Sequence, residues 1–516
     1  MILLRIVIFI FSLSCTLHAE LPDISNLNNC IEDVRKAAAN PPDVPTFDPY
    51  KTDFNQLIAD LQAAKAYLPY IYQEAAAKPL IQFLQNLGET QYILIFNENS
   101  INETLKEIIA DASVAILFQQ EILVKSNAFQ EVVSDLYDSF IKEERRTGKE
   151  TGLPIKPPNY GIIPPLVKFG NAEFGPYTWP GDATYHILGM GCAIVSLPPA
   201  QLKGGLLAWT AIGHETAGHN VTHADIGLLN ELKRKVYDSI YYKFKNLQLA
   251  DYWANCIDES VADVCGYLNM GPSVGIGLIG YFRALGNGKL RTYGYREGPH
   301  PVDLLRGYLA AAVVKRLHFK DALAWSQIIA ADTKKDNGLL FLINSDGNFS
   351  SFPVSLEVAI ASTEVVAQTI LRSILTSLEK HSLQGIQDWL DGDQAIVEKL
   401  ILSLKSDVGL PSNLSGPGFY AAHMVAATTQ ASLQEGAQIE VLFNKMQDFL
   451  GAMHLNNPVW SQIPTGESIA LLEQTFKKLD NQVNVSTDKS IAIFEQKFKE
   501  VEEEIDATIS PSLAVR

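Results

Sequence analysis

The stretch that decides the fold begins at residue 206 and reads LLAWTAIG to residue 213, then HETAGH over residues 214–219. The first eight residues are apolar or small, so they predict a buried helix, with the polar residues within it or at its end. Two histidines and a glutamate in such a place offer two imidazoles and one carboxylate to a metal ion. The stretch therefore predicts a buried helix that holds His214, Glu215 and His219.

The spacing of the two histidines is irregular for a metal-binding helix. His214 and His219 are five residues apart, not the usual four, and five residues of ideal α-helix turn about 500°, so the rings would diverge by about 140°. A single π-type bulge would bring them together, and Gly218 lies where it would help. His219 and His223 are four apart and form an alternative pair. Both pairs stay open from the sequence alone.

A third ligand is predicted from the acidic segment 258–263, DESVAD, in a helical run from Tyr252 to Leu268. Positions 259, 262, 263 and 266 share one narrow helix face of acidic and small residues. Glu259 is therefore the candidate third ligand, and Asp263 is placed to accept the second ring proton of a ligating histidine. A solvated acidic face is the alternative, but the neighbouring residues are apolar.

Segments 214–219 and 259–263 together resemble the gluzincin metallopeptidases, and the six-residue histidine motif is similar to that of the dipeptidyl peptidase III family. The resemblance implies a zincin-like core, a Zn²⁺ cofactor, His214, His219 and Glu259 as its ligands, and Glu215 as general base. The family's acidic motif begins with two glutamates, where this chain has Asp258. The six-residue form also occurs in the peptidases grouped as modulators of gyrase, whose third ligand is a cysteine.

Two neighbouring segments fit this prediction. Residues 192–197, CAIVSL, predict a strand just before the histidine helix, and Pro198-Pro199 favour an edge or terminal place for it. Such an edge would pair with an extended substrate. The stretch 300–306, HPVDLLR, resembles the His-Pro and following Arg found in several gluzincins. We expect His300 and Arg306, or Tyr293 and Tyr295, to donate hydrogen bonds to the oxyanion of a tetrahedral intermediate.

The rest of the chain predicts a mainly α fold with a small β-sheet next to the zinc helix, and helical regions flanking a zincin-like catalytic core. Residues 1–19 have one positive charge, a short apolar run and a terminal alanine, which is typical of a secretory signal peptide. Proline runs near 153–165 and turn residues near 332–353 mark boundaries. We therefore expect an N-terminal helical region over 20–150, the catalytic core over 151–335 and a C-terminal helical domain over 336–516.

Composition excludes some classes of partner. The chain has 41 Lys and Arg against 58 Asp and Glu and no basic block, so we expect no nucleic-acid partner. The apolar run in the leader is too short for a stable membrane span. Four cysteines follow the leader, which is too few for a disulfide framework. Cys256 and Cys265 are predicted to be buried small hydrophobes.

These observations predict an exported zinc peptidase that hydrolyses peptide or protein substrates. A zinc hydrolase of non-peptide amides or esters is one alternative. The other is a helical binding protein that retains a metal site without turnover.

Overall fold

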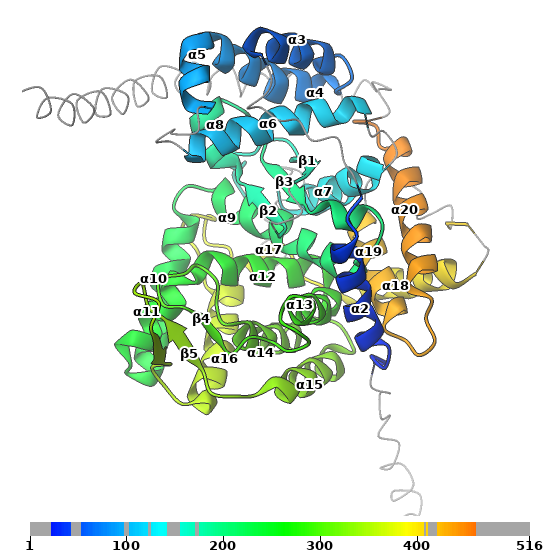
Figure 1. Cartoon of the computed structure of the whole chain (residues 1–516). Coiled ribbons are helices and arrows are strands. Elements are labelled where there is room, and N and C mark those ends of the chain that lie inside the picture. Colours follow the sequence, from blue (N-terminus) through cyan, green and yellow to red (C-terminus); the bar gives the residue numbers. More distant parts are fainter. Residues whose placement is uncertain are drawn as a thin grey trace, which may run out of the picture.

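The computed structural model describes residues 22–42, 53–96, 103–121, 125–141, 155–170, 175–406, 409–410 and 420–460 of the 516-residue chain. These residues form a mainly helical structure with two small three-stranded sheets, which confirms the expected fold class (Figure 1). The expected signal peptide lies outside the described residues.

The N-terminal helices form an apolar core of their own above the first sheet (Figure 1). Its largest side chains come from helices whose apolar residues recur at helical spacing, such as Leu57, Leu61 and Leu68 near α3. Its elements are α3 (Phe54–Lys65), α4 (Tyr70–Tyr72), η1 (Gln73–Ala77), α5 (Lys78–Phe96) and α6 (Glu103–Glu121).

The first sheet separates this core from a larger one below it. Its order is β1-β3-β2, with β1 (Leu166–Phe169) parallel and β2 (Tyr177–Trp179) antiparallel to β3 (Ile194–Leu197). Successive side chains of a strand point to opposite faces, so Ile194 joins the upper core and Val195 the lower one. The sheet is thus covered on both faces.

The strand expected before the histidine helix is present, but its expected edge position is wrong. β3 is the central strand, and β2 lies at one edge of the sheet. The prolines are compatible with a central strand because β3 ends at Leu197, so their missing N–H groups fall outside its hydrogen-bond ladder.

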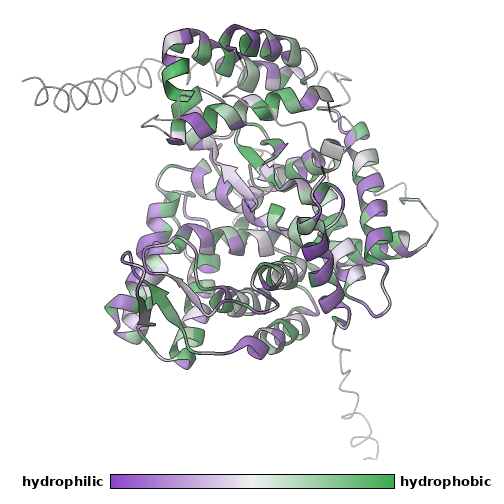
Figure 2. Ribbon diagram, in the orientation of Figure 1, coloured by the Kyte–Doolittle hydropathy of each residue, from purple (hydrophilic) through white to green (hydrophobic). Residues whose placement is uncertain are grey.

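Helices of the larger body surround the second core, which includes side chains from Leu27 in α2 to Met453 in α20. Figure 2 shows hydrophobic and hydrophilic residues alternating along most of these helices, as amphipathic packing requires. The helices are α2 (Leu27–Ala39), α7 (Lys125–Ile141), α8 (Gly181–Leu188), η2 (Pro199–Leu202), η3 (Leu206–Thr210), η4 (Gly213–Asn220), α9 (Val221–Ala224), α10 (Leu228–Phe244), α11 (Leu247–Asn255), α12 (Ile257–Met270), α13 (Pro272–Leu285), α14 (Asp303–Val314), α15 (Ala322–Thr333), η5 (Lys334–Asp336), α16 (Leu356–Arg372), α17 (Leu383–Ile386), α18 (Asp391–Lys405), α19 (Ala421–Ser432) and α20 (Ile439–Asn456).

The second sheet lies at the surface of this body. Its order is β4-β5-β6, with β4 (Tyr293–Tyr295) parallel and β6 (Phe349–Ser351) antiparallel to β5 (Phe341–Ile343). Apolar side chains from both sides of residue 335 pack in the larger core, for example Ile329 and Ala359. The domain boundaries expected from the sequence remain predictions.

Several element boundaries differ from the sequence prediction. The aromatic and β-branched residues and the turn glycines of segment 169–196 favour short strands with turns, yet α8 occupies 181–188. It ends at Gly189, whose φ of 71° closes the helix in the left-handed region. The helical run from Tyr252 to Leu268 is divided at Cys256 between α11 and α12. Among the described residues, no helix combines the length and the apolar character needed to cross a membrane.

Candidate metal centre

A π-helix brings the two spaced histidines onto one face. Residues 213–220 form η4, in which each turn holds about one residue more than in an α-helix. The rings of His214 and His219 consequently lie with their centroids 4.9 Å apart and their planes at 89°. This confirms the expected π-type irregularity.

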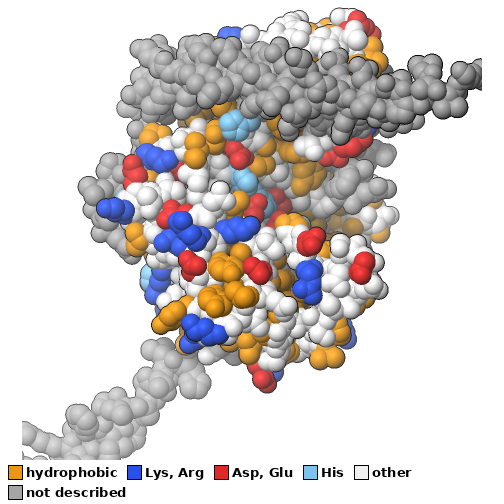
Figure 3. Space-filling view, turned by 90° about the vertical axis from the view of Figure 1, so that its left-hand side faces the viewer, with side chains coloured by type: hydrophobic (Ala, Val, Ile, Leu, Met, Phe, Trp, Pro, Cys, Tyr) orange, Lys and Arg blue, Asp and Glu red, His pale blue; other side chains and the backbone are white. Residues whose placement is uncertain are grey.

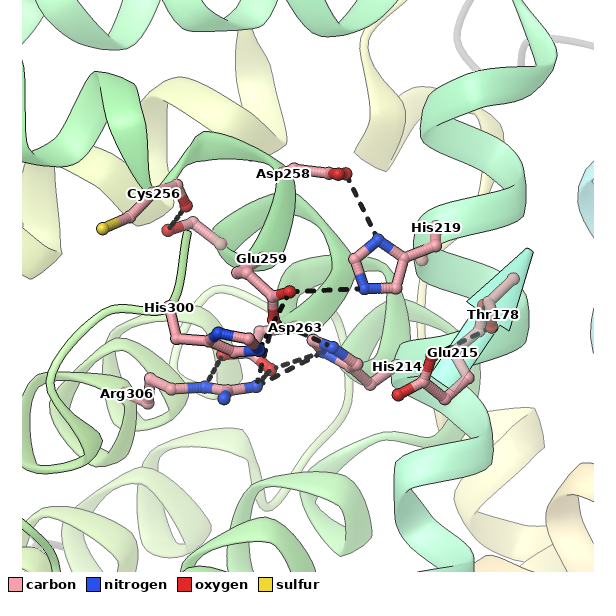
Figure 4. A network of polar contacts seen from close by, with 12 residues as sticks. Thr178, His214, Glu215, His219, Cys256, Asp258, Glu259, Asp263, His300 and Arg306 are labelled. Atoms are coloured by element: carbon pink, nitrogen blue, oxygen red, sulfur yellow. Dashed lines mark hydrogen bonds and ion pairs between the residues drawn. The ribbon is translucent and has the colours of Figure 1, made fainter. Parts of the chain in front are cut away.

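Small residues allow η4 and α12 to approach closely. A Cβ atom built on Gly218 would lie 2.4 Å from the Cα of Ala262, and one built on Gly266 would lie 3.3 Å from the backbone of Gly213. A side chain at Gly218 would therefore push the two helices apart, and one at Gly266 would make a tight contact with the facing backbone. The expected small-residue face of α12 does pack against the histidine helix, and it places Glu259 opposite both histidines (Figure 4).

The two histidines and Glu259 form a group of donors suited to a metal ion. Glu259 Oε2 lies 3.2 Å from Nε2 of His214, and Oε1 lies 3.7 Å from Nε2 of His219. Donor atoms of the three residues all lie within 4.8 Å of one another. The buried Oε2 of Glu259 has only the His214 ring and, at 4.0 Å, the Arg306 guanidinium beside it, which fits an oxygen that binds a cation. Two imidazoles and one carboxylate are a ligand set that zinc accepts.

Carboxylates orient both rings from behind. Asp263 Oδ1 lies 2.9 Å from His214 Nδ1, and Asp258 Oδ1 lies 3.3 Å from His219 Nδ1. Each carboxylate can accept the ring proton on Nδ1, which leaves Nε2 directed at the group of donors. The expected role of Asp263 beside a histidine thus has the required geometry.

Arg306 of α14 holds Asp263 in place. Its Nε and one terminal nitrogen donate to the two oxygens of Asp263 over 2.9 and 2.7 Å. The guanidinium is buried, and the same terminal nitrogen lies 4.0 Å from Glu259 Oε2. Arg306 compensates part of the negative charge that α12 carries into the interior.

The carboxylates control the protonation of the histidines. Burial by itself would lower the pKa of His214, but the hydrogen bond to Asp263 and the nearby Glu259 raise it to about 10. Burial opposes ionisation of Glu259 as well, but His214, His219 and Arg306 hold its pKa well below its usual range. The carboxylates therefore favour the protonated imidazole of His214 when no cation is bound, and a metal ion would take the place of that proton.

Glu215 lies on the other side of the histidines, next to the first sheet (Figure 4). Its side chain is buried, and its Oε2 accepts a hydrogen bond of 2.9 Å from Thr178 Oγ1 on β2. The neighbours of Thr178 on β2, Tyr177 and Trp179, each donate to Asp111 Oδ2 of α6 over 2.7 Å. The upper helices thus hold the strand that positions Glu215.

The residues predicted to donate hydrogen bonds to an oxyanion differ in burial and in distance from the candidate metal ligands. His300, in the loop after β4, has Nε2 3.2 Å from Glu259 Oε1, so it faces the group of donors (Figure 4). Arg306 lies beside the same group of donors, and two of its nitrogens donate hydrogen bonds to Asp263. Tyr293 and Tyr295 are largely exposed on β4, and no contact joins them to the group among the described residues.

A second group of donors adjoins the first. Donor atoms of His219, His223 and Asp258 also lie within 4.8 Å of one another. The alternative histidine pair is thus close to an acidic residue as well. Sequence reasoning assigned no role to Thr178, Asp182 or Asp258, because each acts through contacts between segments distant in the chain.

Figure 3 shows histidine and acidic side chains together at a hollow on one face of the molecule. Cysteine sulfurs belong to neither group of donors among the described residues, and all four described cysteines are buried free thiols. The burial expected for Cys256 and Cys265 is confirmed, and it raises the pKa of each to about 12.

Comparison of the chain with protein-family models, with curated proteins and with solved structures finds no significant match in any of the three.

Proposed function

We propose that this chain is an exported zinc peptidase that hydrolyses peptide or protein substrates. The observation that carries the proposal is the position of Glu215, directly after one candidate ligand and opposite the carboxylates that orient the ring nitrogens. His214, His219 and Glu259 are the residues that would hold the zinc ion.

A zinc ion held here would lower the pKa of a bound water to about 7 and would polarise a carbonyl. Glu215 would accept the water proton. Thr178 engages Oε2, which leaves Oε1 to receive that proton, and the hydrogen bond keeps the carboxylate from rotating. Arg306 and Asp263 keep His214 Nε2 aimed at the site.

Substrate backbone would be held by β2 in this proposal. β2 pairs with β3 along one side, and among the described residues its other side has no partner strand. An extended peptide can pair with such an edge, and Thr178 places that edge beside Glu215. His300 is the donor for the oxyanion in this proposal, because its side chain is more exposed than that of Arg306. The guanidinium of Arg306 is already engaged by Asp263.

The decisive comparison is between the parent protein and Glu215→Gln, both loaded with zinc and tested on casein and a peptide library. We expect Glu215→Gln to lose a factor of about 10² to 10⁴ in turnover, because it keeps the shape of the side chain and removes the base. Its zinc content should be unchanged, since Glu215 is not a ligand. Glu364→Gln, a surface ion-pair substitution on α16, is the matched control and should retain full activity.

The proposal fails if Glu215→Gln cleaves as fast as the parent. It also fails if both proteins hold zinc and neither cleaves any peptide, in which case the site is a non-catalytic metal site.

A further inference from the structure

His223 lies next to the proposed metal centre, and the proposed function gives it no role. It lies on α9, directly after η4, and its ring is sandwiched between two carboxylates. Nδ1 lies 3.1 Å from Asp182 Oδ2, and Nε2 lies 3.1 Å from Asp258 Oδ2. Asp182 comes from α8 and Asp258 from α12, so three helices contribute to this arrangement.

The surroundings of His223 repeat those of His214. In both, Nδ1 faces one carboxylate and Nε2 faces another: Asp263 and Glu259 at His214, Asp182 and Asp258 at His223. A carboxylate on Nδ1 is the usual partner of a metal-binding histidine, because it fixes the tautomer that exposes Nε2. Asp182 therefore prepares His223 for a cation between Nε2 and Asp258.

One carboxylate oxygen of Asp258, Oδ2, is available to bind such a cation. Its Oδ1 faces His219 Nδ1 over 3.3 Å, and its Oδ2 faces His223. When His219 binds the first metal through Nε2, its Nδ1 proton is accepted by Oδ1, and Oδ2 remains available. Both positions can then be filled at once without any histidine losing both of its ring protons.

We propose that His223 Nε2 and Asp258 Oδ2 hold a second divalent cation of the zinc type next to the first. Imidazole and carboxylate donors suit this class of ion. With two protein ligands and the rest water, this site binds more weakly than the three-ligand site. Its side chains are also more accessible, at 22% for His223 and 31% for Asp258, against 7% and 9% for His214 and Glu259, so the ion exchanges more readily with solvent.

The test is a zinc titration by equilibrium dialysis, with zinc per chain measured by elemental analysis. The parent protein should bind two equivalents in two steps. His223→Gln should lose the second step and keep the first. His186→Gln is the matched control, since His186 is an exposed histidine on α8 that contacts Tyr160, and it should keep both steps.

Asp182→Asn gives an independent check that leaves the imidazole in place. Because Asp182 only orients His223, this variant should weaken the second step by about 10- to 100-fold and leave the first unchanged. If His223→Gln does not fold, the Asp182→Asn variant tests the second site by itself.

A parent protein that binds a single equivalent up to millimolar zinc overturns the second site, and so does His223→Gln that still binds two. Neither result affects the peptidase proposal. Two-step binding without hydrolysis supports the second site while the proposed function fails.

Discussion

Gly218 of η4 faces Ala262 of α12 so closely that a Cβ atom at position 218 would lie 2.4 Å from the Cα of Ala262. The contact is between backbones, so no side-chain rotation can relieve it. Gly218→Ala should separate the helices, lower stability by about 1–3 kcal/mol and weaken zinc binding, because Glu259 moves away from the histidines. Urea unfolding and zinc titration measure the two effects.

Gly451→Ala is the control for this substitution. Gly451 lies within α20, and a Cβ there would meet nothing within 4 Å. The change should stabilise the protein by about 0.5–1 kcal/mol through helix propensity alone and leave zinc binding intact. If Gly218→Ala behaves in the same way, the close approach does not position the site.

Asp263→Asn tests the buried partner of His214. The change removes the negative charge and replaces one acceptor oxygen by an NH2 donor, so the side chain can no longer accept from both His214 Nδ1 and Arg306 Nε, and Arg306 is left buried without its carboxylate. Zinc affinity should fall by about 10- to 100-fold, and stability by roughly 3–5 kcal/mol. Asp332→Asn, in the distant buried pair with Arg283, should lower stability without changing zinc affinity. Equal zinc affinity in parent and Asp263→Asn would contradict the orienting role.

Zinc binding should strengthen as the pH rises. The carboxylates raise the pKa of His214 to about 10, against about 6.5 in an unfolded chain. A raised pKa contributes stability to the metal-free protein that is fully present below pH 6.5 and is lost as the pH rises through 10. Zinc displaces that proton, so the stability gained on adding zinc should increase between pH 6.5 and 8.5.

Calorimetric titration in two buffers of different ionisation enthalpy measures the released protons directly. The expected value is at least one proton per zinc at pH 7. A zinc affinity that is flat between pH 6.5 and 8.5 would show that His214 is neutral before the metal binds.

Thr178 should act on turnover rather than on metal binding. Thr178→Val keeps the shape of the side chain but removes the hydrogen bond to Glu215 Oε2. We expect kcat to fall by about 10- to 100-fold with KM and zinc content nearly unchanged, since a hydrogen bond to a charged group contributes about 1.5–3 kcal/mol. Thr178→Ser should restore most of the activity, whereas a loss confined to KM would argue for a role in binding substrate.

The sequence predicted those parts of the site that lie within one helix. A π-type turn was the condition under which His214 and His219 could act together, and the small residues near Glu259 suited a close helix contact; both are present. The partners from other elements could not be read, because Thr178 is 37 residues from Glu215 and Asp182 is 41 from His223. No local pattern encodes such contacts.

The central position of β3 was missed for a similar reason. A proline shows only that its own N–H cannot join the hydrogen-bond ladder. The order of strands depends on which other segments of the chain pair with β3, here β1 and β2. Helix α8 was missed because its aromatic and β-branched residues favour strands locally, while packing against both α9 and the upper helices favours the helix.

The measurement that tests the central claim most directly is elemental analysis of the purified protein loaded with one equivalent of zinc. The parent and His223→Gln should each retain one zinc per chain, because His214, His219 and Glu259 are intact in both. His214→Ala, His219→Ala and Glu259→Gln should each lose it. Retention of a full equivalent by His219→Ala would contradict the proposed metal centre, and the mechanism derived from it would fall with it.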